Sequence, residues 1–349
     1  MTRPLVVHVV GARPNYMKVA PVYAALEERG NVEQRLVHTG QHYDALLKDV
    51  FFAELPLPRP HVQLDARTME TACSELEQTF AQLQPDVVVV AGDVNSTLAG
   101  ATAARRCGIG VVHVEAGLRS GDWSMPEEVN RVLTDHLSAL LLTTLPSGDQ
   151  HLLEEHLPQD RIRRVGNTMI DTLRSNLDTA RALEPWRAFG LERHGYVLAT
   201  LHRPALVDDA DLLQEMFLAL DDVAETCPVI FPMHPRTRKN LRTEPLRVQL
   251  TEPLSYRPFL GLEADARAVI TDSAGVQEET TVLGVQCFTL RNVTERPETL
   301  AGTNRLLGLD PGALRSVPSL LDEQTPGQIP ELWDGRAGGR AAEAIEAVL

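Results

Sequence analysis

Residues 5–18 read LVVHVVGARPNYMK, and this order of an apolar strand, a glycine turn and a helix decides the fold. Pro14 suits the first helical turn because its missing N–H has no partner there. Helix amino termini attract anions through exposed N–H groups and partial positive charge, and Arg13 and Lys18 add two cations beside this one. The alternative is an ordinary βα turn with both cations on the surface.

A second element of the same kind lies far along the chain, where residues 268–279 read AVITDSAGVQEE. Ser273 fits as the N-cap, and the small residues Ala274 and Gly275 follow it, which predicts another helix amino terminus open to anions. Two such elements predict an α/β protein with two Rossmann-like domains that face one ligand across a cleft.

Length and charge limit the function classes. A chain of 349 residues has room for about two domains, and its 43% hydrophobic and 23% charged residues are typical of globular proteins. The net charge of −15, from 48 acidic and 33 basic residues, argues against nucleic-acid or anionic-membrane binding. An acidic protein can still bind a phosphorylated ligand, but only at a place where cations and helix amino termini are close together.

Cysteine usage and terminal sequence predict a cytoplasmic protein. The four cysteines are scattered without a CxxC pair, as expected for reduced thiols and not for disulfides or zinc. Residues 1–4 do not open a signal peptide, and no apolar run approaches the ~18–20 residues of a membrane span. No His/Asp/Glu spacing resembles a ligand set, so we expect no metal.

Short β-branched runs alternate with amphipathic stretches, which predicts parallel sheets built from βαβ units. The predicted strands are 5–10, 35–38, 86–91, 110–115, 139–144, 161–165, 196–201, 228–232, 247–251, 268–271 and 286–290. We place the first domain at residues 1–166, with a last helix at 336–349 packing back on it, and the second at 167–335. The proline- and glycine-rich segment 308–335 reads as a surface return path.

Ligands of open α/β sheets bind beyond the carboxyl ends of the strands, so polar residues there are the site candidates. Asp93 and Glu115 follow neighbouring predicted strands and should converge on one crevice. The structural alternative is that Asp93 caps the next helix and Glu115 pairs with Arg119.

The segment from Ser124 to Arg131 reads SMPEEVNR and predicts a helix start. Ser124 and Glu127 fit a capping box, and Glu127 fits an i,i+4 ion pair with Arg131. That alone explains the pattern structurally. The functional alternative directs Glu127 and Arg131 at the crevice beside Asp93 and Glu115, where crowded carboxylates would raise at least one pKa toward that of an acid or base working near neutrality.

Two strands of the second half end in a histidine followed closely by an arginine: His202 with Arg203, and His234 with Arg236. Histidine and arginine both donate hydrogen bonds to phosphate oxygens, so the pairs predict a grip on a diphosphate. The alternative for each histidine is a structural role.

Taken together, the motifs closely resemble those of the UDP-N-acetylglucosamine 2-epimerase family, of the non-hydrolysing bacterial type. The resemblance covers almost the whole chain. It is carried by GARPNYMKVAPV, TGQHYD, GDVNSTLA, HVEAGLRSGD, PEEVNRVLTDH, GNTMIDTL, LHRP, TDSAGVQEE and RNVTERPET.

The resemblance implies a glycosyltransferase-B-like fold, a homodimer, and reversible conversion of UDP-GlcNAc to UDP-ManNAc without metal or nicotinamide cofactor. UDP leaves as the C2 proton is lost, giving a 2-acetamidoglucal, and then adds back. Matching positions imply roles in catalysis for Asp93, Glu115 and Glu127 (proton transfer and ring contact), for Arg131 (orienting them) and for His202 (at the diphosphate). They imply substrate contacts for Arg13, Lys18 and Arg296 (phosphate or sugar), for Ser273, Ala274 and Gly275 (backbone donors to phosphate), for Glu279 (ribose) and for Phe259 (near the uracil). His234 is a further substrate-binding candidate, from its pairing with Arg236.

Departures from the family pattern and open alternatives remain. Ala274 stands where glycine is usual, and Ala205-Leu206 replaces Glu-Asn. Family members that are activated by their own substrate at a second site have extra glutamines after the Gln-His pair, whereas Tyr43-Asp44 follows Gln41-His42 here. We therefore expect weak or absent activation by substrate. A hydrolysing 2-epimerase that releases ManNAc and UDP, a glycosyltransferase and a non-catalytic sensor are the alternatives. The sequence leaves open the exact sugar, including 3-acetamido or uronate derivatives, and which carboxylate is acid or base.

Overall fold

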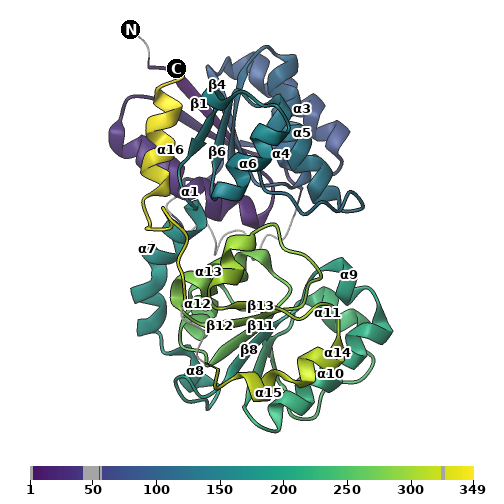
Figure 1. The fold of residues 1–349 in the computed structure, drawn as a ribbon. Coiled ribbons are helices and arrows are strands. Elements are labelled where there is room, and N and C mark those ends of the chain that lie inside the picture. Colours follow the sequence, from purple (N-terminus) through teal and green to yellow (C-terminus); the bar gives the residue numbers. More distant parts are fainter. Residues whose placement is uncertain (1–2, 42–54, 56, 324–326) are drawn as a thin grey trace. The chain divides into compact units, whose positions relative to one another are not determined.

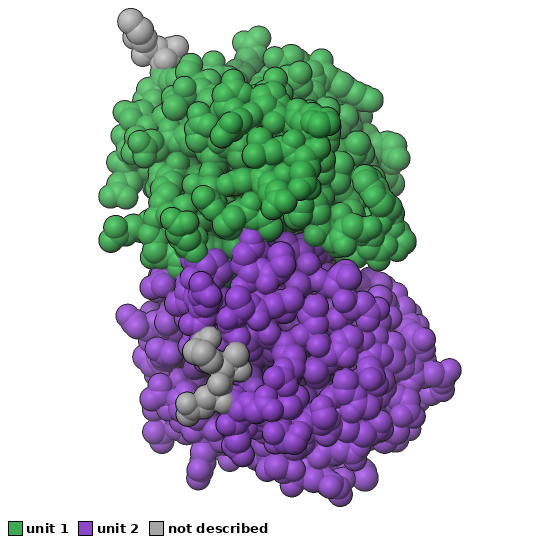
Figure 2. Space-filling view, in the orientation of Figure 1, with its two compact units in different colours: residues 1–172, 331–349 green, residues 173–330 purple. Residues whose placement is uncertain are grey.

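The computed structural model describes residues 3–41, 55, 57–323 and 327–349, which form two compact units (Figure 2). Unit 1 comprises residues 1–172 and 331–349, and unit 2 comprises residues 173–330. The first division falls inside helix α7 (Thr168–Ala182), and the second precedes Trp333. Unit 1 is therefore built from two separate stretches of the chain.

Unit 1 contains a seven-stranded parallel sheet in the order β3-β2-β1-β4-β5-β6-β7. Its strands are β1 (Leu5–Val10), β2 (Glu33–His38), β3 (Val62–Gln63), β4 (Val87–Ala91), β5 (Gly110–Ala116), β6 (Leu140–Thr143) and β7 (Ile162–Arg164). Its other elements are α1 (Arg13–Arg29), α3 (Met69–Leu83), α4 (Asn95–Arg106), α5 (Pro126–Leu137), α6 (Pro146–Glu154), η1 (Gln159–Arg161) and α16 (Ala337–Glu346).

Unit 2 contains a six-stranded parallel sheet in the order β10-β9-β8-β11-β12-β13. Its strands are β8 (Val197–Thr200), β9 (Val229–Pro232), β10 (Gln249–Thr251), β11 (Ala268–Thr271), β12 (Gln286–Thr289) and β13 (Asn304–Leu306). Its other elements are α8 (Pro185–Ala188), α9 (Pro204–Val207), α10 (Ala210–Ala224), α11 (Pro235–Asn240), α12 (Tyr256–Ala264), α13 (Ala274–Leu283), η2 (Pro297–Ala301), α14 (Pro311–Arg315) and α15 (Val317–Leu320).

The predicted α/β class with two Rossmann-like parallel sheets is confirmed (Figure 1). Each predicted strand overlaps an observed one. Two strands were not predicted, namely β3 and β13, which have two and three residues at the edges of their sheets. Within the described residues, no helix has both the length and the apolarity needed to cross a membrane.

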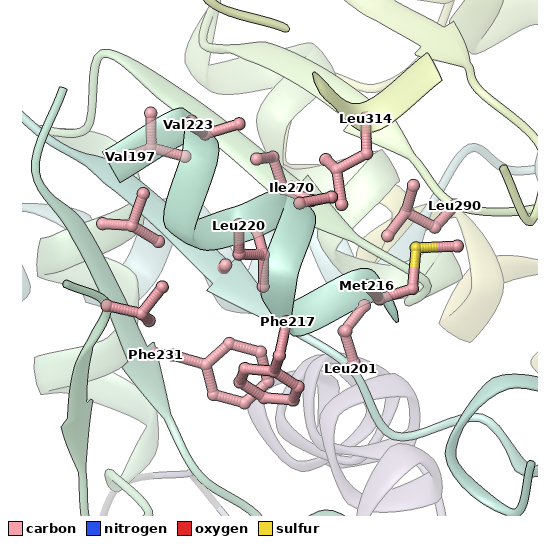
Figure 3. Close-up of a cluster of buried hydrophobic side chains, with 14 of the residues drawn as sticks. Val197, Leu201, Met216, Phe217, Leu220, Val223, Phe231, Ile270, Leu290 and Leu314 are labelled. Carbon is pink, nitrogen blue, oxygen red and sulfur yellow. The ribbon is translucent and has the colours of Figure 1, made fainter. Parts of the chain in front are cut away.

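Helix α10 shows how the sequence builds the core of unit 2. Asp209 caps it by accepting hydrogen bonds from the N–H groups of Asp211 and Leu212. Its apolar residues recur at helical spacing and pack on the sheet, where the rings of Phe217 and Phe231 lie 5.0 Å apart at 47° (Figure 3). Burying one such side chain stabilises the fold by about 1.5–3 kcal/mol.

The segment 308–335 was predicted to be a surface return path, but it also contributes residues to the core. It contains α14 and α15, whose Leu314 and Val317 are completely buried in the same core as α10 (Figure 3). Further along, Trp333 is buried in unit 1, and its indole N–H donates to the Thr144 carbonyl at 3.1 Å. The prolines and glycines suggested an irregular path, whereas the isolated apolar residues between them are core residues.

Helix α16 packs beside α1 in unit 1 (Figure 1). Asp171 of α7 caps α16, because its carboxylate accepts the N–H groups of Ala337 at 3.0 Å and Gly338 at 2.7 Å. A Cβ atom at Gly338 would lie 2.5 Å from the carbonyl oxygen of Pro21 in α1. The two helices therefore approach so closely that only glycine fits.

We expect Gly338→Ala to lower the free energy of unfolding by about 1–3 kcal/mol, because the added methyl group meets backbone that cannot move independently. Gly339→Ala is the matched control: no atom lies within 4 Å of its Cβ position, so alanine should raise stability by up to about 1 kcal/mol. Urea unfolding of both variants measures the difference. Equal effects of the two substitutions would contradict the close approach of α16 to α1.

Candidate active site

Two carboxylates follow the adjacent parallel strands β4 and β5 of unit 1. Asp93 comes directly after the turn residue Gly92, and Glu115 lies at the end of β5. The register against β6 shifts between Val114 and Ala116, and Glu115 has a left-handed backbone with φ of 71°. Such a conformation in a non-glycine residue is strained and is typical of functional positions.

The carboxylate of Glu115 forms an ion pair with the ammonium group of Lys18 from α1, and both side chains are buried. The alternative pairing of Glu115 with Arg119 is wrong, because Arg119 binds Asp135 and Glu155 instead. A surface position of Lys18 was the structural alternative to the expected contact with phosphate or sugar. Lys18 lies instead beside a carboxylate at the end of the sheet.

Asp93 is held by Arg131 of α5, whose guanidinium also binds Glu128 at 2.8 Å. Glu128 in turn accepts the backbone N–H groups of Ser120 and Gly121. Asp93 does not cap α4, since the N-cap there is Val94 and has no side-chain hydrogen bond. The structure thus brings Asp93 and Arg131 together.

The predicted start of α5 was wrong in two respects. The N-cap is Met125, and the Ser124 hydroxyl donates to Asp122 at 2.6 Å instead of capping the helix. Glu127 is exposed, and none of the hydrogen bonds or ion pairs of the described residues involves its side chain. The partner of Arg131 on α5 is Glu128, at i,i+3 instead of i,i+4.

The start of α1 differs from the open anion site expected there. The Asn15 side-chain oxygen accepts the N–H groups of Gly11 and Ala12, each at 3.1 Å. A Cβ at Gly11 would collide with Thr39 and Ser96, so this glycine serves packing within unit 1. The side chain of Arg13 lies outside the described part of the structure.

Gln41 contacts Ser96, the residue that packs against Gly11. Its side-chain oxygen accepts the backbone N–H and the hydroxyl group of Ser96, each at 2.9 Å. This places Gln41 against the start of α4 in unit 1. His42 lies outside the described residues, so the structure does not bear on the expectation of weak substrate activation.

Helix α13 of unit 2 keeps an open amino terminus. Ser273 is the N-cap, and its hydroxyl accepts the N–H of Val276 at 3.4 Å. The N–H groups of Ala274 and Gly275 have no hydrogen-bond partner within the described residues. Two adjacent donors at a helix amino terminus can bind an anionic oxygen.

His202 contacts the buried carboxylate of Asp272, which directly precedes the N-cap of this helix and was not predicted as a site residue. Asp272 accepts the backbone N–H groups of His202 at 2.9 Å and Arg203 at 2.7 Å, and one of its oxygens lies 3.0 Å from Nδ1 of His202. Burial alone would raise the pKa of Asp272, but the His202 ring and the two N–H donors hold it below its usual value. The His202 ring is 46% exposed and so remains accessible.

Three arginines gather in unit 2. Arg296 is buried and pairs with Glu278 and Glu295, and the buried Arg291 binds both oxygens of Glu295. Arg203 forms no side-chain hydrogen bond or ion pair within the described residues. Burial and the nearby positive charge of Arg291 lower the pKa of Arg203. An anion would relieve this crowding of positive charge.

The remaining predicted residues of unit 2 have identifiable surroundings. The buried Glu279 accepts the hydroxyl of Tyr256 at 2.8 Å. Phe259 is half-buried against an apolar cluster of unit 2. His234 is exposed and caps α11 by accepting the Arg236 N–H at 3.2 Å, which agrees with the structural alternative for this histidine.

Glu263 of α12 is completely buried next to Glu279. Burial and the negative charge of Glu279 raise the pKa of Glu263 well above its ordinary value near 4.5. Neither carboxyl oxygen of Glu263 has a hydrogen-bond partner within the described residues, so no donor offsets this effect. Burial and the neighbouring charge both favour the protonated form of Glu263.

We expect Glu263→Gln to reduce the loss of stability on going from pH 5 to pH 8. The raised pKa of Glu263 means that its stabilising contribution is complete below about pH 4.5 and is lost as the pH rises through the folded-state pKa. One proton corresponds to about 1.4 kcal/mol per pH unit in that interval. Urea unfolding at both pH values, with the exposed Glu252→Gln as control, tests this; identical pH profiles of wild type and Glu263→Gln would refute it.

Sequence reasoning missed several residues that hold the candidates in place: Glu128, Asp272, His113 and Asp135. A signal existed for Glu128, because i,i+3 spacing to Arg131 is as compatible with a helical ion pair as i,i+4. Asp272 stands directly after a strand, where site residues were sought. Nothing local marked His113 or Asp135. Within the described residues, no cluster of His, Cys, Asp and Glu is arranged as a metal site.

The comparisons with known proteins agree with this architecture. A family model for UDP-N-acetylglucosamine 2-epimerase matches residues 24–346. The UDP-N-acetylglucosamine 2-epimerase of Methanocaldococcus jannaschii is 38% identical over 97% of each chain. The UDP-2,3-diacetamido-2,3-dideoxy-D-glucuronate 2-epimerase of Pseudomonas aeruginosa is 37% identical over 86% of this chain and 87% of its own.

Solved structures give the same result. The crystal structure of the M. jannaschii enzyme in complex with UDP-GlcNAc and UDP has a TM-score of 0.91 at 37% identity, covering 98% of this chain and 99% of the other. The calicheamicin glycosyltransferase CalG4, 16% identical with a TM-score of 0.56 and covering 100% of this chain and 99% of its own, shows likeness of fold alone. Together with the two Rossmann-like sheets, these likenesses define an α/β enzyme of the glycosyltransferase-B-like class. Within that class, the chain belongs to the UDP-N-acetylglucosamine 2-epimerase family of isomerases.

Proposed function

We propose that the protein interconverts UDP-GlcNAc and UDP-ManNAc without hydrolysis, with unit 2 holding the nucleotide and unit 1 supplying the groups that act on the sugar. The observation that carries the proposal is the presence of two ion-paired carboxylates at the ends of β4 and β5. Asp93 is paired with Arg131, and Glu115 is paired with Lys18. The open donors of Ala274 and Gly275 support diphosphate binding in unit 2.

The chemistry requires both sets of groups. The C2–H bond has no neighbouring carbonyl, so it becomes acidic only as the C1–O bond breaks and positive charge develops on the ring. A carboxylate takes the C2 proton and stabilises that charge, while His202 and the N–H groups of α13 stabilise the leaving diphosphate. The electrons of the C2–H bond form the C1–C2 double bond of 2-acetamidoglucal. UDP then adds back to C1 as a proton returns to the opposite face of C2.

The exposed Glu127 takes part in this proposal as the third carboxylate of the motif. Its position at the first turn of α5, four residues before Arg131, leaves it accessible to a ligand. The assignment of acid and base among Asp93, Glu115 and Glu127 follows from comparing the rate of C2 proton exchange with the rate of UDP release in single variants.

Incubation with UDP-GlcNAc in deuterated water tests the proposal. NMR should show UDP-ManNAc with deuterium at C2, and no free sugar at early times. Free ManNAc with UDP would establish a hydrolysing 2-epimerase, turnover only with an added acceptor would establish a transferase, and absence of deuterium incorporation would leave a sensor.

A second substrate is favoured by the P. aeruginosa relative, whose name specifies UDP-2,3-diacetamido-2,3-dideoxy-D-glucuronate and whose identity is nearly the same as that of the M. jannaschii enzyme. UDP-GlcNAc is the first choice because the M. jannaschii match extends over more of both chains. The ratio of kcat/KM for the two nucleotide sugars decides between them.

A further inference from the structure

A buried histidine of unit 1 connects two segments that the proposed mechanism uses. His113 of β5 is completely buried, with Nδ1 2.6 Å from Asp135 and Nε2 2.8 Å from the carbonyl oxygen of Gly92. Gly92 directly precedes Asp93, and His113 lies two residues before Glu115. The ring therefore joins the end of β4 to the body of β5 at the level of both carboxylates.

The hydrogen-bond partners define the protonation of this ring. A carbonyl oxygen only accepts, so Nε2 carries a proton. Asp135 faces Nδ1 with one oxygen, and its other oxygen accepts the Gly117 N–H at 3.1 Å and lies 2.8 Å from the Arg119 guanidinium. The His113 ring thus lies between the Gly92 carbonyl and the Asp135 carboxylate, with one ring nitrogen facing each.

The charge of Asp135 is consistent with this arrangement. Burial alone would raise its pKa, but the His113 ring and the Arg119 guanidinium hold the pKa of this carboxyl below its usual value. Arg119 is itself fixed by Glu155 through two hydrogen bonds of 2.6 and 2.8 Å. His113 and Asp135 thus form a buried pair in which Asp135 is held by His113, Arg119 and the Gly117 N–H.

The pair fixes backbone on both sides of the strained residue. Gly92 and Gly117 both have positive φ, of 68° and 81°, and Glu115 lies between His113 and Gly117 at 71°. His113 holds the carbonyl before Asp93, and Asp135 holds the N–H two residues after Glu115. The Gly92 N–H also donates to the Val114 carbonyl at 3.0 Å, so the two strands stay paired when the histidine contact is lost. Within the described residues, however, no other hydrogen bond holds the Gly92 carbonyl or the Gly117 N–H, so release of either contact loosens the turn to which it belongs.

We propose that His113 and Asp135 are positioning residues for the reaction: the hydrogen-bonded pair links the turn that carries Asp93 to the bulge that carries Glu115 and so sets the two carboxylates relative to each other. This inference rests on the proposed function. The pair touches neither substrate nor reacting atoms and acts through the backbone of Gly92 and Gly117.

The variants His113→Asn and Asp135→Asn test this role. His113→Asn breaks the contact to the Gly92 carbonyl, and Asp135→Asn replaces the charged acceptor of the Gly117 N–H with a neutral amide, which weakens its contacts to Gly117, His113 and Arg119. We therefore expect kcat for epimerisation to fall about 100-fold in His113→Asn, the effect of a misplacement near 1 Å, and to fall in Asp135→Asn as well. KM for UDP-GlcNAc and the dissociation constant of UDP should stay close to wild type, because the proposed nucleotide contacts are in unit 2. The double variant His113→Gln with Asp135→Asn, which offers amide hydrogen bonds in place of the histidine–carboxylate pair, should recover part of kcat.

His8→Asn is the matched control. His8 is also completely buried in the sheet of unit 1, but its Nε2 contacts only Gln34, at 2.9 Å, and burial lowers its pKa to about 4. We expect this variant to lose thermal stability while keeping the wild-type kcat. The control separates damage to the sheet from displacement of the carboxylates.

The outcomes are distinct. A large kcat loss in His113→Asn or Asp135→Asn, with unchanged UDP binding and stability no worse than His8→Asn, supports the positioning role. Wild-type kcat in either folded variant, or equal loss of kcat in His8→Asn, overturns it. Should His113→Asn not fold, Asp135→Asn and the double variant decide by the same criteria. Failure of the wild-type protein to epimerise UDP-GlcNAc would instead contradict the proposed function.

Discussion

Glu115→Gln is expected to lower kcat for epimerisation by ~10²–10⁴-fold, the range attributable to a positioned acid or base. Glutamine keeps the size of the side chain but can neither take nor deliver a proton at C2. It also removes the negative charge that the ammonium group of Lys18 neutralises. Proton exchange at C2, followed by NMR in deuterated water, measures the effect directly.

Two further measurements make this result specific to Glu115. UDP binding by calorimetry should be unchanged, since the proposed phosphate and ribose contacts belong to unit 2. Glu77→Gln removes a carboxylate of α3 that pairs with Arg106 on the surface, and should leave kcat unchanged. A Glu115→Gln protein that exchanges the C2 proton at the wild-type rate would remove Glu115 from the chemistry.

Gly117→Ala is expected to lower the free energy of unfolding by about 2–5 kcal/mol, which is the sum of two costs. Its φ of 81° strains any residue with a side chain. In addition, the new Cβ would lie 2.4 Å from the carbonyl oxygen of Gly148 at the start of α6. Backbone must therefore move close to Glu115, and kcat should fall as well.

Gly30→Ala separates the two costs. Gly30 ends α1 with φ of 67°, and no atom lies within 4 Å of its Cβ position. Only the backbone strain of about 1–2 kcal/mol applies there. Urea unfolding that gave Gly117→Ala and Gly30→Ala the same stability would show that β5 and α6 can separate without cost.

Local pattern was sufficient to predict the fold. The central strands β1, β4, β8 and β11 are short, largely apolar runs, and such runs are buried on both faces of parallel sheets. The short strands β3 and β13 were missed because two or three residues at a sheet edge carry no pattern of their own. Likewise, Leu314 and Val317 were hidden among prolines and glycines that favour loops.

The candidate residues could be located by sequence, but their partners could not. Glu115 and Lys18 are far apart in the chain, and no periodicity connects them. Arg131 has acidic residues at both helical spacings, and only the structure shows that Glu128, bound to two backbone N–H groups, is the one it contacts. The Ser124 motif misled because Asp122 competes for the same hydroxyl group.

The discontinuity of unit 1 has a consequence for biosynthesis. A ribosome produces residues 173–330 before residues 331–349, so the polypeptide of unit 2 is complete while unit 1 still lacks α16 and Trp333. Until then α1 exposes the surface around Pro21 that Gly338 later covers, and the Thr144 carbonyl has no indole donor. Most of unit 1 therefore emerges first, but it can reach its final packing only after the whole of unit 2 has been synthesised.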